Sequence, residues 1–333
     1  MPYPVFDLHS DTADRLAWQT LPQAIKNRVG MDAYGPGDAD HLSDICDLAC
    51  NRGHLSLDAI GATPWVQCLA CYIPDDLSPT EAATFHAHVE AYLLAQAERH
   101  DAFTLAQNVN DIPEEPAAGQ LVGIKTIENA RLFAADLSLI ERLAQQGLLM
   151  ASLSWNAPGP LASGHDDEMA GLTPIGIEAL RRMEDAHVVL DVSHLNDRSF
   201  DDVLRHARRP FVASHSNSRA VCGHPRNLTD AQFAEIRDRG GIVGLNYCCL
   251  FLSDSGEPTF DDISRHIDHW LELGGENTIA LGSDFDGCDT PACIATAREM
   301  PSFQEQLVRR FGDDITRALC YDNALAFFRR VAA

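Results

Sequence analysis

Short apolar runs rich in β-branched residues alternate with amphipathic segments along this 333-residue chain. Such apolar runs predict buried strands, whereas apolar residues spaced three and four apart predict helices. Eight strands are expected, at residues 5–11, 65–73, 120–128, 148–155, 187–194, 211–216, 241–247 and 278–284. Helices are expected between most of them, at residues 80–100, 138–147, 173–186, 199–207, 229–240 and 260–274.

The alternation of strand and helix favours a parallel sheet covered by helices, and eight such units favour closure into a TIM-type (β/α)8 barrel. A doubly wound open sheet is the alternative, but no glycine-rich phosphate-binding turn follows the first strand. We expect residues 1–333 to form a single domain with a C-terminal helical segment at about 313–333. A long insert is expected at about 12–64, rich in Gly, Pro and Asp around residues 34–38.

Composition narrows the range of partners. The formal net charge of −24, from 49 acidic residues against 25 Lys and Arg, disfavours binding to nucleic acid or to an anionic membrane. No apolar run approaches the ~20 residues of a membrane-spanning helix. The start of the chain lacks a basic segment followed by an apolar one, so we expect no secretory signal and a cytoplasmic location. The ten scattered cysteines are expected to be reduced, with Cys68 and Cys71 a buried pair.

Ionisable residues stand at the ends of the predicted strands. In a barrel these ends converge on the C-terminal mouth, where such folds carry their chemistry. Three imidazoles and three carboxylates exceed the four ligands of one tetrahedral ion and suit two divalent ions that share a carboxylate, for which we choose Glu128. The candidate ligands are His9, Asp11, Glu128, His194, His215 and Asp284.

The alternative for any histidine is a core residue hydrogen-bonded to a neighbouring backbone group. We keep that interpretation for the histidines that fall on predicted helices. His86 and His88 are expected to face different ways, and His266 and His269 to lie on a solvated helix edge.

The motifs around these residues resemble those of the membrane (renal) dipeptidase family, peptidase family M19, within the amidohydrolase superfamily of metal-dependent barrels. The resemblance runs from about residue 5 to about residue 290. The segments that carry it are His9-Ser-Asp11, GIKTIE ending in Glu128, LDVSH ending in His194, ASHSNSRAV with His215, HPRNLTD with Arg226, and GSDFDG with Asp284.

The resemblance implies two zinc ions that share Glu128. One zinc would also be held by His9, Asp11 and Asp284, and the other by His194 and His215. Other superfamily members bridge their metals with a carboxylated lysine. Because the M19 pattern uses glutamate, we expect Lys125 to face the barrel or a helix instead.

The expected chemistry is hydrolysis. A water between two divalent cations loses a proton near neutral pH and becomes a nucleophile. Asp284 is expected to take that proton and later to pass it to the leaving amine, so that Asp284 and Glu128 are the candidate catalytic residues. Arg226 is expected to bind the free carboxylate of a dipeptide through two parallel hydrogen bonds, the alternative being a pair with a surface acid.

One position departs from the family pattern. Well-known members carry a histidine after the fourth strand that is thought to bind the substrate, whereas this chain reads LSWN, with Trp155 in that place. An indole N–H donates one hydrogen bond and carries no charge. We expect Trp155 and Asn156 to contact the substrate with altered specificity. Phe251, where the eukaryotic pattern has a tyrosine, weakens any transfer of detailed substrate preference.

The leading hypothesis is therefore a zinc dipeptidase for small dipeptides, tolerant of a D-residue at the C-terminal position. One alternative is another amidohydrolase reaction, on N-acyl amino acids or lactones. A second is a non-catalytic metal-containing protein that binds a small ligand, for which Trp155 is the best argument. A nucleotide-type deaminase fits less well, because those enzymes begin with HxH and this chain has HxD. Family members are often dimers, so the resemblance also allows a homodimer.

Overall fold

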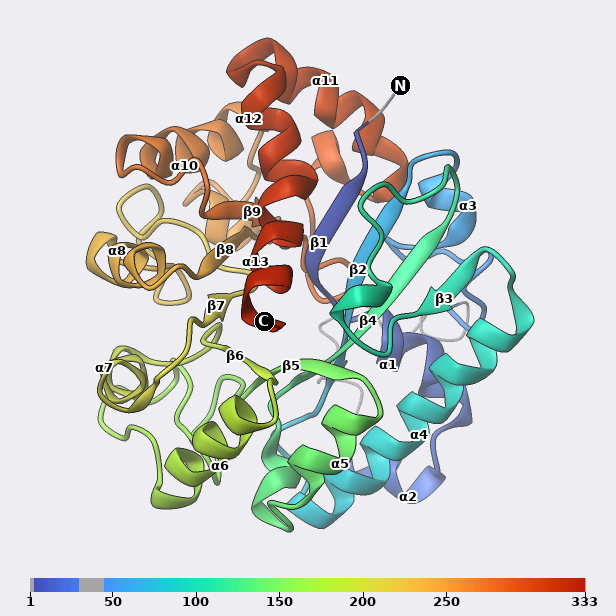
Figure 1. Cartoon of the computed structure of the whole chain (residues 1–333), viewed down its shortest axis with the longest axis vertical. Helices are drawn as coiled ribbons and strands as arrows, with labels where there is room; N and C mark the ends of the chain where they lie inside the picture. The colour runs from blue at the N-terminus through green and yellow to red at the C-terminus, as the bar shows by residue number, and fades with distance from the viewer. Residues whose placement is uncertain (1–2, 30–44, 333) are drawn as a thin grey trace.

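Eight parallel strands close into a barrel with the helices outside it (Figure 1). The structure, a computed structural model, describes residues 3–29 and 45–332. The hydrogen-bonded order is β2-β1-β9-β8-β7-β6-β5-β4, and a further pairing of β2 with β4 closes the ring. The predicted (β/α)8 fold is thereby confirmed.

The strands are β1 (Val5–Ser10), β2 (Trp65–Tyr72), β3 (Phe103–Leu105), β4 (Leu121–Glu128), β5 (Leu148–Ser152), β6 (Val189–Asp191), β7 (Val212–Ala213), β8 (Ile242–Leu245) and β9 (Ile279–Leu281). The α-helices are α1 (Thr12–Ala17), α2 (Gln23–Val29), α3 (Leu57–Ile60), α4 (Pro79–Arg99), α5 (Leu139–Gln145), α6 (Pro174–Asp185), α7 (Asp197–His206), α8 (Asp230–Asp238), α9 (Cys249–Leu252), α10 (Phe260–Glu272), α11 (Met300–Phe311), α12 (Asp313–Arg317) and α13 (Asn323–Ala332). Short 3-10 helices are η1 (Trp18–Thr20), η4 (Val109–Asp111), η5 (Arg131–Ala134), η6 (Ala292–Ile294) and η7 (Ala297–Glu299), and η8 (Ala318–Asp322) is a π-helical turn.

The eight barrel strands and the six expected helices lie where the pattern predicts them, but β3 was not predicted. It pairs with the first three residues of β4, from Phe103 opposite Leu121 to Leu105 opposite Gly123. The strand β5 then pairs with the second half of β4. Only three residues long and partly exposed, β3 lacks the continuous apolar run that marks the buried strands.

Several strands end earlier than predicted, because side chains take over the backbone hydrogen bonds. On β6, Asp191 Oδ1 accepts the amide N–H of Ser193 at 2.9 Å and that of Ser214, beyond β7, also at 2.9 Å. On β1, Asp7 Oδ1 similarly accepts the amides of His9 and Ser283. Asp191 and Asp7 thus join β6 to the chain after β7 and β1 to the chain after β9, at the points where these two ladders stop.

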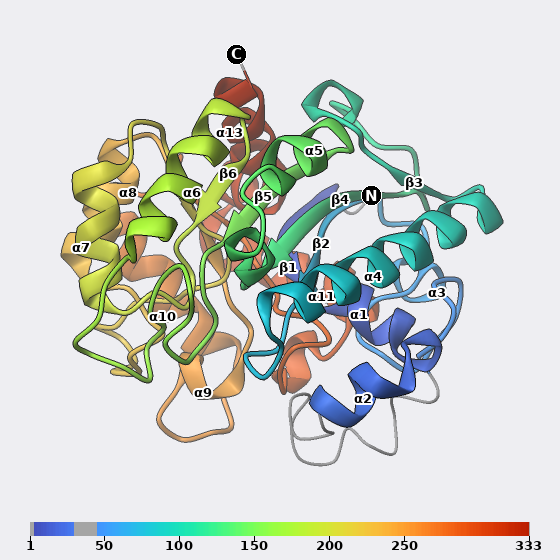
Figure 2. The same cartoon turned by 90° about the horizontal axis from the view of Figure 1, so that it is seen from below.

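The helix α13 closes the N-terminal end of the barrel. Its Phe327 and Phe328 pack with one interior cluster to which all eight barrel strands contribute apolar side chains. Figure 2 shows α13 at one end of the barrel and α9 at the other. The predicted helical segment at 313–333 consists of α12, η8 and α13. This closure leaves the opposite, C-terminal mouth for the ionisable residues.

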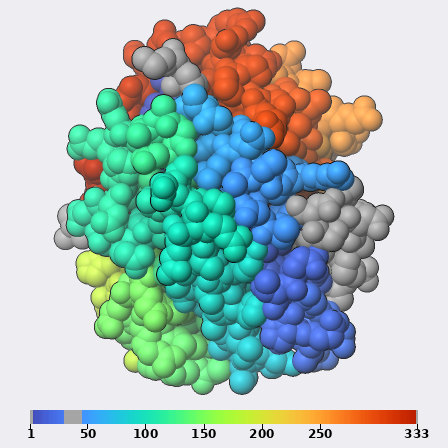
Figure 3. Space-filling model, turned by 90° about the vertical axis from the view of Figure 1, so that its right-hand side faces the viewer, coloured from blue at the N-terminus to red at the C-terminus, as the bar shows by residue number. Residues whose placement is uncertain are grey.

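The expected insert at 12–64 contains α1, η1, α2 and α3, and its Gly- and Pro-rich stretch at 34–38 lies outside the described residues. Figure 3 shows the side of the molecule that is covered mostly by the N-terminal third of the chain, in blue to green. Within the part that the structure describes, no helix is long and apolar enough to cross a membrane. The assignment of the chain to a single domain stays a prediction.

Candidate metal centre

The structure brings all six predicted ligands together at the C-terminal mouth. His9 lies in β1, Asp11 directly before α1, and Glu128 ends β4. The other three follow strand ends, at residues 194, 215 and 284. All six side chains are buried, with residues at most 8% exposed. Strands far apart in sequence therefore deliver their ionisable ends to one place, as the barrel predicts.

Glu128 lies between the two halves of the group. Its Oε2 is 3.4 Å from His9 Nε2, whereas its Oε1 is 2.6 Å from His194 Nε2 and 3.9 Å from His215 Nε2. On the first side, His9 Nε2 is also 3.6 Å from Asp11 Oδ1 and 3.9 Å from Asp284 Oδ1. The two carboxylate oxygens thus face different sets of ligands, which is the geometry that a bridging carboxylate needs.

Each half of the group gathers three candidate ligand atoms. Ligand atoms of His9, Asp11 and Glu128 lie within 4.8 Å of one another, as do those of Glu128, His194 and His215. Among the described residues, His9 Nε2 and Asp11 Oδ1 are buried without a hydrogen-bond partner. An unsatisfied buried polar group costs about 1–3 kcal/mol, a penalty that a coordinated cation removes. Imidazole nitrogen with carboxylate oxygen is a donor set that suits zinc.

The electrostatics show how crowded the negative charge is. Burial, with the nearby carboxylate charge, raises the pKa of Asp11 and of Asp284 to about 6. Burial alone would lower the pKa of His9, but Asp11 and Glu128 raise it well above its ordinary value. Burial lowers the pKa of His194 and of His215 well below the usual range, which favours neutral imidazoles that can donate a lone pair.

The backbone of the site is strained where ligands are presented. His194 has φ 70° and Asp284 has φ 62°, in the left-handed region that costs non-glycine residues of order 1–3 kcal/mol. Close by, a Cβ on Gly287 would lie 2.1 Å from Asp11 Oδ2 and 2.4 Å from Asp284 Oδ1. The glycine therefore leaves the space in which the two carboxylates stand.

Arg226 is 4% exposed and weakly bonded. One terminal nitrogen lies 3.4 Å from Ser216 Oγ and the other 3.3 Å from the carbonyl oxygen of His215. Its guanidinium lies over the ring of Phe251, 5.4 Å from the centroid. Within the described part of the chain it forms no ion pair, so the alternative of a surface partner is not observed. The guanidinium is therefore a buried cation with unused hydrogen-bond donors at the mouth.

The residues after β5 lie beside the second half of the centre. The ring of Trp155 is half-buried, 6.2 Å from that of His194 and 5.0 Å from that of Tyr72 between centroids. The Oδ1 of Asn156 is 2.8 Å from His194 Nδ1. Because this contact engages the amide oxygen of Asn156, the structure gives it a role that was not predicted. Its contact with substrate, and that of Trp155, stay predictions.

The histidines that lie on helices are not brought to the site. His86 is buried in α4, whereas the His88 ring faces Thr20 at 3.0 Å, so the two face different ways as predicted. The prediction of a solvated edge is wrong for His266. It is fully buried, with Nδ1 accepting the amide of Ser218 and Nε2 bonded to the carbonyl oxygen of Leu252.

Two other expectations are confirmed. Lys125 forms an ion pair with Glu90 of α4 at 2.8 Å, on the outside of the barrel, and is thus directed away from the metal centre. Cys68 and Cys71 are both buried, and all ten cysteines are free thiols.

Sequence reasoning missed four polar residues around the centre. Asn246 donates to Asp284 Oδ2 at 3.0 Å, Ser214 Oγ lies 2.7 Å from His215 Nδ1, and Asp191 bonds that serine. The half-buried ring of His165 is 6.3 Å from that of His194. An acid inside the apolar run HVVLDVSH was the available signal for Asp191. The loop around His165, GHDDEM, gives no such signal.

The chain resembles known proteins in both sequence and structure. The chain matches the model of the membrane dipeptidases, peptidase family M19, over residues 3–333. An uncharacterized protein from the pqqA 5' region of Klebsiella pneumoniae is 36% identical over 192 residues, which are 54% of this chain and 71% of that protein. An uncharacterized dipeptidase of Schizosaccharomyces pombe is 28% identical over 168 residues, 48% of this chain and 40% of the yeast protein.

Two crystal structures resemble this one over its length. A metallopeptidase from Rhodobacter sphaeroides, crystallised with a phosphinate mimic of the dipeptide L-Ala-D-Ala, is 27% identical with a TM-score of 0.83, covering 99% of this chain and 100% of that chain. A dipeptidase of family M19 is also 27% identical, with a TM-score of 0.81 and 99% of each chain covered.

Proposed function

The chain belongs to the membrane dipeptidase family, peptidase family M19, and we propose that it is a metal-dependent dipeptidase that cleaves small dipeptides. The observation that carries the proposal is the position of Glu128, with one oxygen toward His9 and the other toward His194 and His215. A binding protein without catalysis has no need of such a shared carboxylate.

We infer two divalent ions, most simply Zn²⁺. His9, Asp11, Glu128 and Asp284 would hold the first ion, and Glu128, His194 and His215 the second. When bound, two such ions supply a water activated near neutral pH and polarise the carbonyl beside it. The protein contributes the fixed positions of the ligands and the exclusion of bulk water from the mouth.

Asp284 is the proposed proton carrier. Its Oδ2 accepts a hydrogen bond from Asn246, which fixes the carboxylate and leaves Oδ1 on the side of His9. A carboxylate held in this way takes a proton from the attacking water and delivers it to the leaving nitrogen of the dipeptide.

Arg226 is the proposed receptor for the free carboxylate of the dipeptide. Its terminal nitrogens make only long contacts, at 3.3 and 3.4 Å, so that two parallel hydrogen bonds to a carboxylate improve their bonding. The ligand of the Rhodobacter sphaeroides relative mimics a dipeptide with a C-terminal D-residue, which supports including L,D-dipeptides among the substrates.

The direct test is release of amino acids from a panel of L,L- and L,D-dipeptides by the purified full chain. We expect cleavage with Zn²⁺ present, loss of cleavage after chelation, and recovery when Zn²⁺ is returned. A panel that stays uncleaved with two metal ions bound per chain would reject the dipeptidase and favour the non-catalytic binding protein.

Replacing Arg226 separates a dipeptidase from an amidohydrolase that ignores the carboxylate. We predict that Arg226→Ala lowers kcat/KM for dipeptides roughly 10- to 100-fold, mainly through KM, because hydrogen bonds to a charged group contribute about 1.5–3 kcal/mol. The same dipeptides with an amidated C-terminus serve as matched substrates and should lose nothing further. Equal losses on both substrate sets would contradict the assignment.

A further inference from the structure

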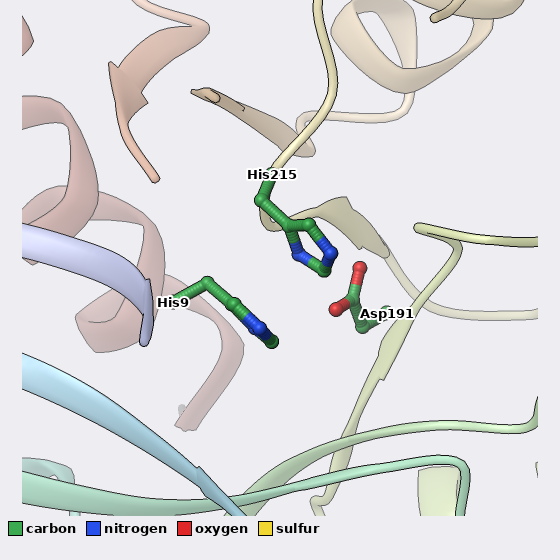
Figure 4. A group of neighbouring side chains, drawn as sticks. All are labelled: His9, Asp191 and His215. Atoms are coloured by element: carbon green, nitrogen blue, oxygen red, sulfur yellow. The ribbon is translucent and has the colours of Figure 1, made fainter. Parts of the chain in front are cut away.

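Two hydrogen bonds connect the imidazole of His215, through Ser214, to the carboxylate of Asp191. The Nδ1 of His215 lies 2.7 Å from Ser214 Oγ, and Ser214 Oγ lies 2.5 Å from Asp191 Oδ2. Figure 4 shows Asp191 close to the rings of His215 and His9, at the end of β6. Asp191 is 4% exposed, and none of the roles assigned above uses it.

The direction of these hydrogen bonds follows from the chemistry of the groups. Asp191 Oδ1 already accepts the amide N–H of Ser193 and of Ser214. An ionised carboxylate only accepts, so the single hydroxyl hydrogen of Ser214 is donated to Asp191 Oδ2. The serine oxygen then has only lone pairs left, and it must accept the Nδ1–H of His215.

The tautomer of His215 is thereby fixed. With the proton on Nδ1, its Nε2 presents a lone pair toward Glu128 Oε1 and toward His194 Nε2, which is 2.9 Å away. Asn156 Oδ1 accepts the Nδ1–H of His194 in the same manner, so that His194 Nε2 is also a lone pair. Two imidazole lone pairs and a carboxylate oxygen then converge with no hydrogen between them, an arrangement that a cation stabilises.

We propose that Asp191, acting through Ser214, is a positioning residue that holds His215 in the tautomer required for the second metal site. This inference rests on the proposed metal centre. The carboxylate of Asp191 sets the direction of the hydrogen bonds through Ser214 to His215. These bonds act on a single ligand, which belongs to the second ion only.

Asp191 is better placed for this role than for holding an ion itself. Ligand atoms of His9, Asp191 and His215 do lie within 4.8 Å of one another. Both oxygens of Asp191, however, are occupied by three hydrogen-bond donors, and His215 Nδ1 is occupied by Ser214. A third ion there would have to compete with these bonds.

The substitution Asp191→Asn reverses the relay without removing it. The two backbone amides require an acceptor, so the amide oxygen takes the place of Oδ1 and the NH2 group faces Ser214 Oγ. Ser214 then accepts from Asn and is free to donate to His215 Nδ1, which moves the imidazole proton to Nε2 and blocks coordination. The substitution Ser214→Ala removes the relay by deleting one hydroxyl while every backbone bond remains.

The test is stepwise Zn²⁺ binding by the full chain in competition with a chelator, with thermal unfolding recorded alongside. We expect Ser214→Ala and Asp191→Asn each to weaken one of the two ions by roughly 10- to 100-fold, the usual effect of losing the partner of a ligating histidine. The other ion and the unfolding temperature should stay close to wild type. The control is Ser199→Ala, which deletes a buried hydroxyl that donates to the carbonyl oxygen of Ser163 and accepts its backbone amide, outside the metal centre.

Wild-type affinity for both ions in Ser214→Ala would overturn the inference. So would equal loss of both ions or loss of the fold, because a relay to His215 alone has no reason to affect either. The proposed function fails separately, if the wild-type chain binds Zn²⁺ yet cleaves no dipeptide.

Discussion

At the residue scale, the six candidate ligands share the task of holding ions, and one of them, Asp284, is also proposed to carry a proton. Among the three carboxylate ligands, Asp284 has a neutral amide, that of Asn246, bonded to one of its oxygens. That bond fixes the carboxylate while leaving it basic. Its role should therefore be separable from metal binding.

We predict that Asp284→Asn retains metal but lowers kcat by about 10²- to 10⁴-fold, the range for losing a general acid–base group. The amide keeps the size of the carboxylate and one acceptor oxygen, but it cannot carry the proton. Metal content and steady-state hydrolysis of one dipeptide measure the two properties. Asp322→Asn, a half-buried acid paired with Arg317 near the opposite end of the barrel, is the control. Near wild-type kcat in Asp284→Asn would end the assignment.

The sequence predicted the ligands because imidazoles and carboxylates at the ends of apolar runs leave a visible pattern. It could not predict which neighbours orient them. Ser214 and Asn156 each contact a candidate ligand through one hydrogen bond, to a histidine 1 and 38 positions away along the chain. His165 reaches the site from a loop whose path depends on tertiary packing. Such contacts have no periodicity, so only the folded chain reveals them.

At the scale of elements, the loop after β9 is the most constrained part of the mouth. Asp284 and Asp286 both have positive φ, and Asp286 accepts hydrogen bonds from Thr12 and from the backbone amide of His54. This loop therefore joins α1 and the residues before α3 to the metal centre. The predicted strand at 278–284 was too long because β9 ends at Leu281 and the loop begins there.

We predict that Gly287→Ala weakens the ion on the His9 side. The added Cβ would lie 2.1 Å from an oxygen of Asp11 and 2.4 Å from one of Asp284, so both carboxylates must move. Zn²⁺ binding by the full chain should show one ion weakened at least about tenfold, the effect expected when ligand geometry is disturbed. Gly223→Ala, where a Cβ would meet nothing within 4 Å, is the matched control. Unchanged affinity in Gly287→Ala would show that the carboxylates do not need this space.

At the scale of the whole molecule, the two ends of the barrel do different things. One end is filled by apolar side chains and closed by α13, and the other carries the ionisable group. Strand and helix periodicity predicted the barrel and the helical nature of the C-terminal segment. It could not place α13 across the barrel end, because an amphipathic pattern indicates which face of a helix is buried but not which element that face packs against. The homodimer and the cytoplasmic location stay predictions.

We predict that Phe328→Ala lowers stability without altering the metal centre. The ring of Phe328 stacks on that of Phe6, 5.4 Å between centroids and 7° between planes, and is fully buried. Loss of a buried phenylalanine costs about 3–5 kcal/mol of unfolding free energy. Denaturant unfolding measures the cost, with Leu94→Ala, at a 43% exposed position, as the control. A Phe328→Ala chain that stays folded but loses its metal would contradict the independence of metal binding at the mouth from packing at the closed end.

The central claim is that side chains from separate strands meet around a pair of cations that share Glu128. The decisive measurement is elemental analysis of the purified wild-type chain and of Glu128→Gln. The control is Glu184→Gln, which alters a buried carboxylate bonded to Arg208 far from the mouth. We expect two divalent ions per chain in the wild type and in Glu184→Gln, and fewer than one in Glu128→Gln. A wild-type chain without stoichiometric metal, or a Glu128→Gln chain that keeps both ions, would contradict it.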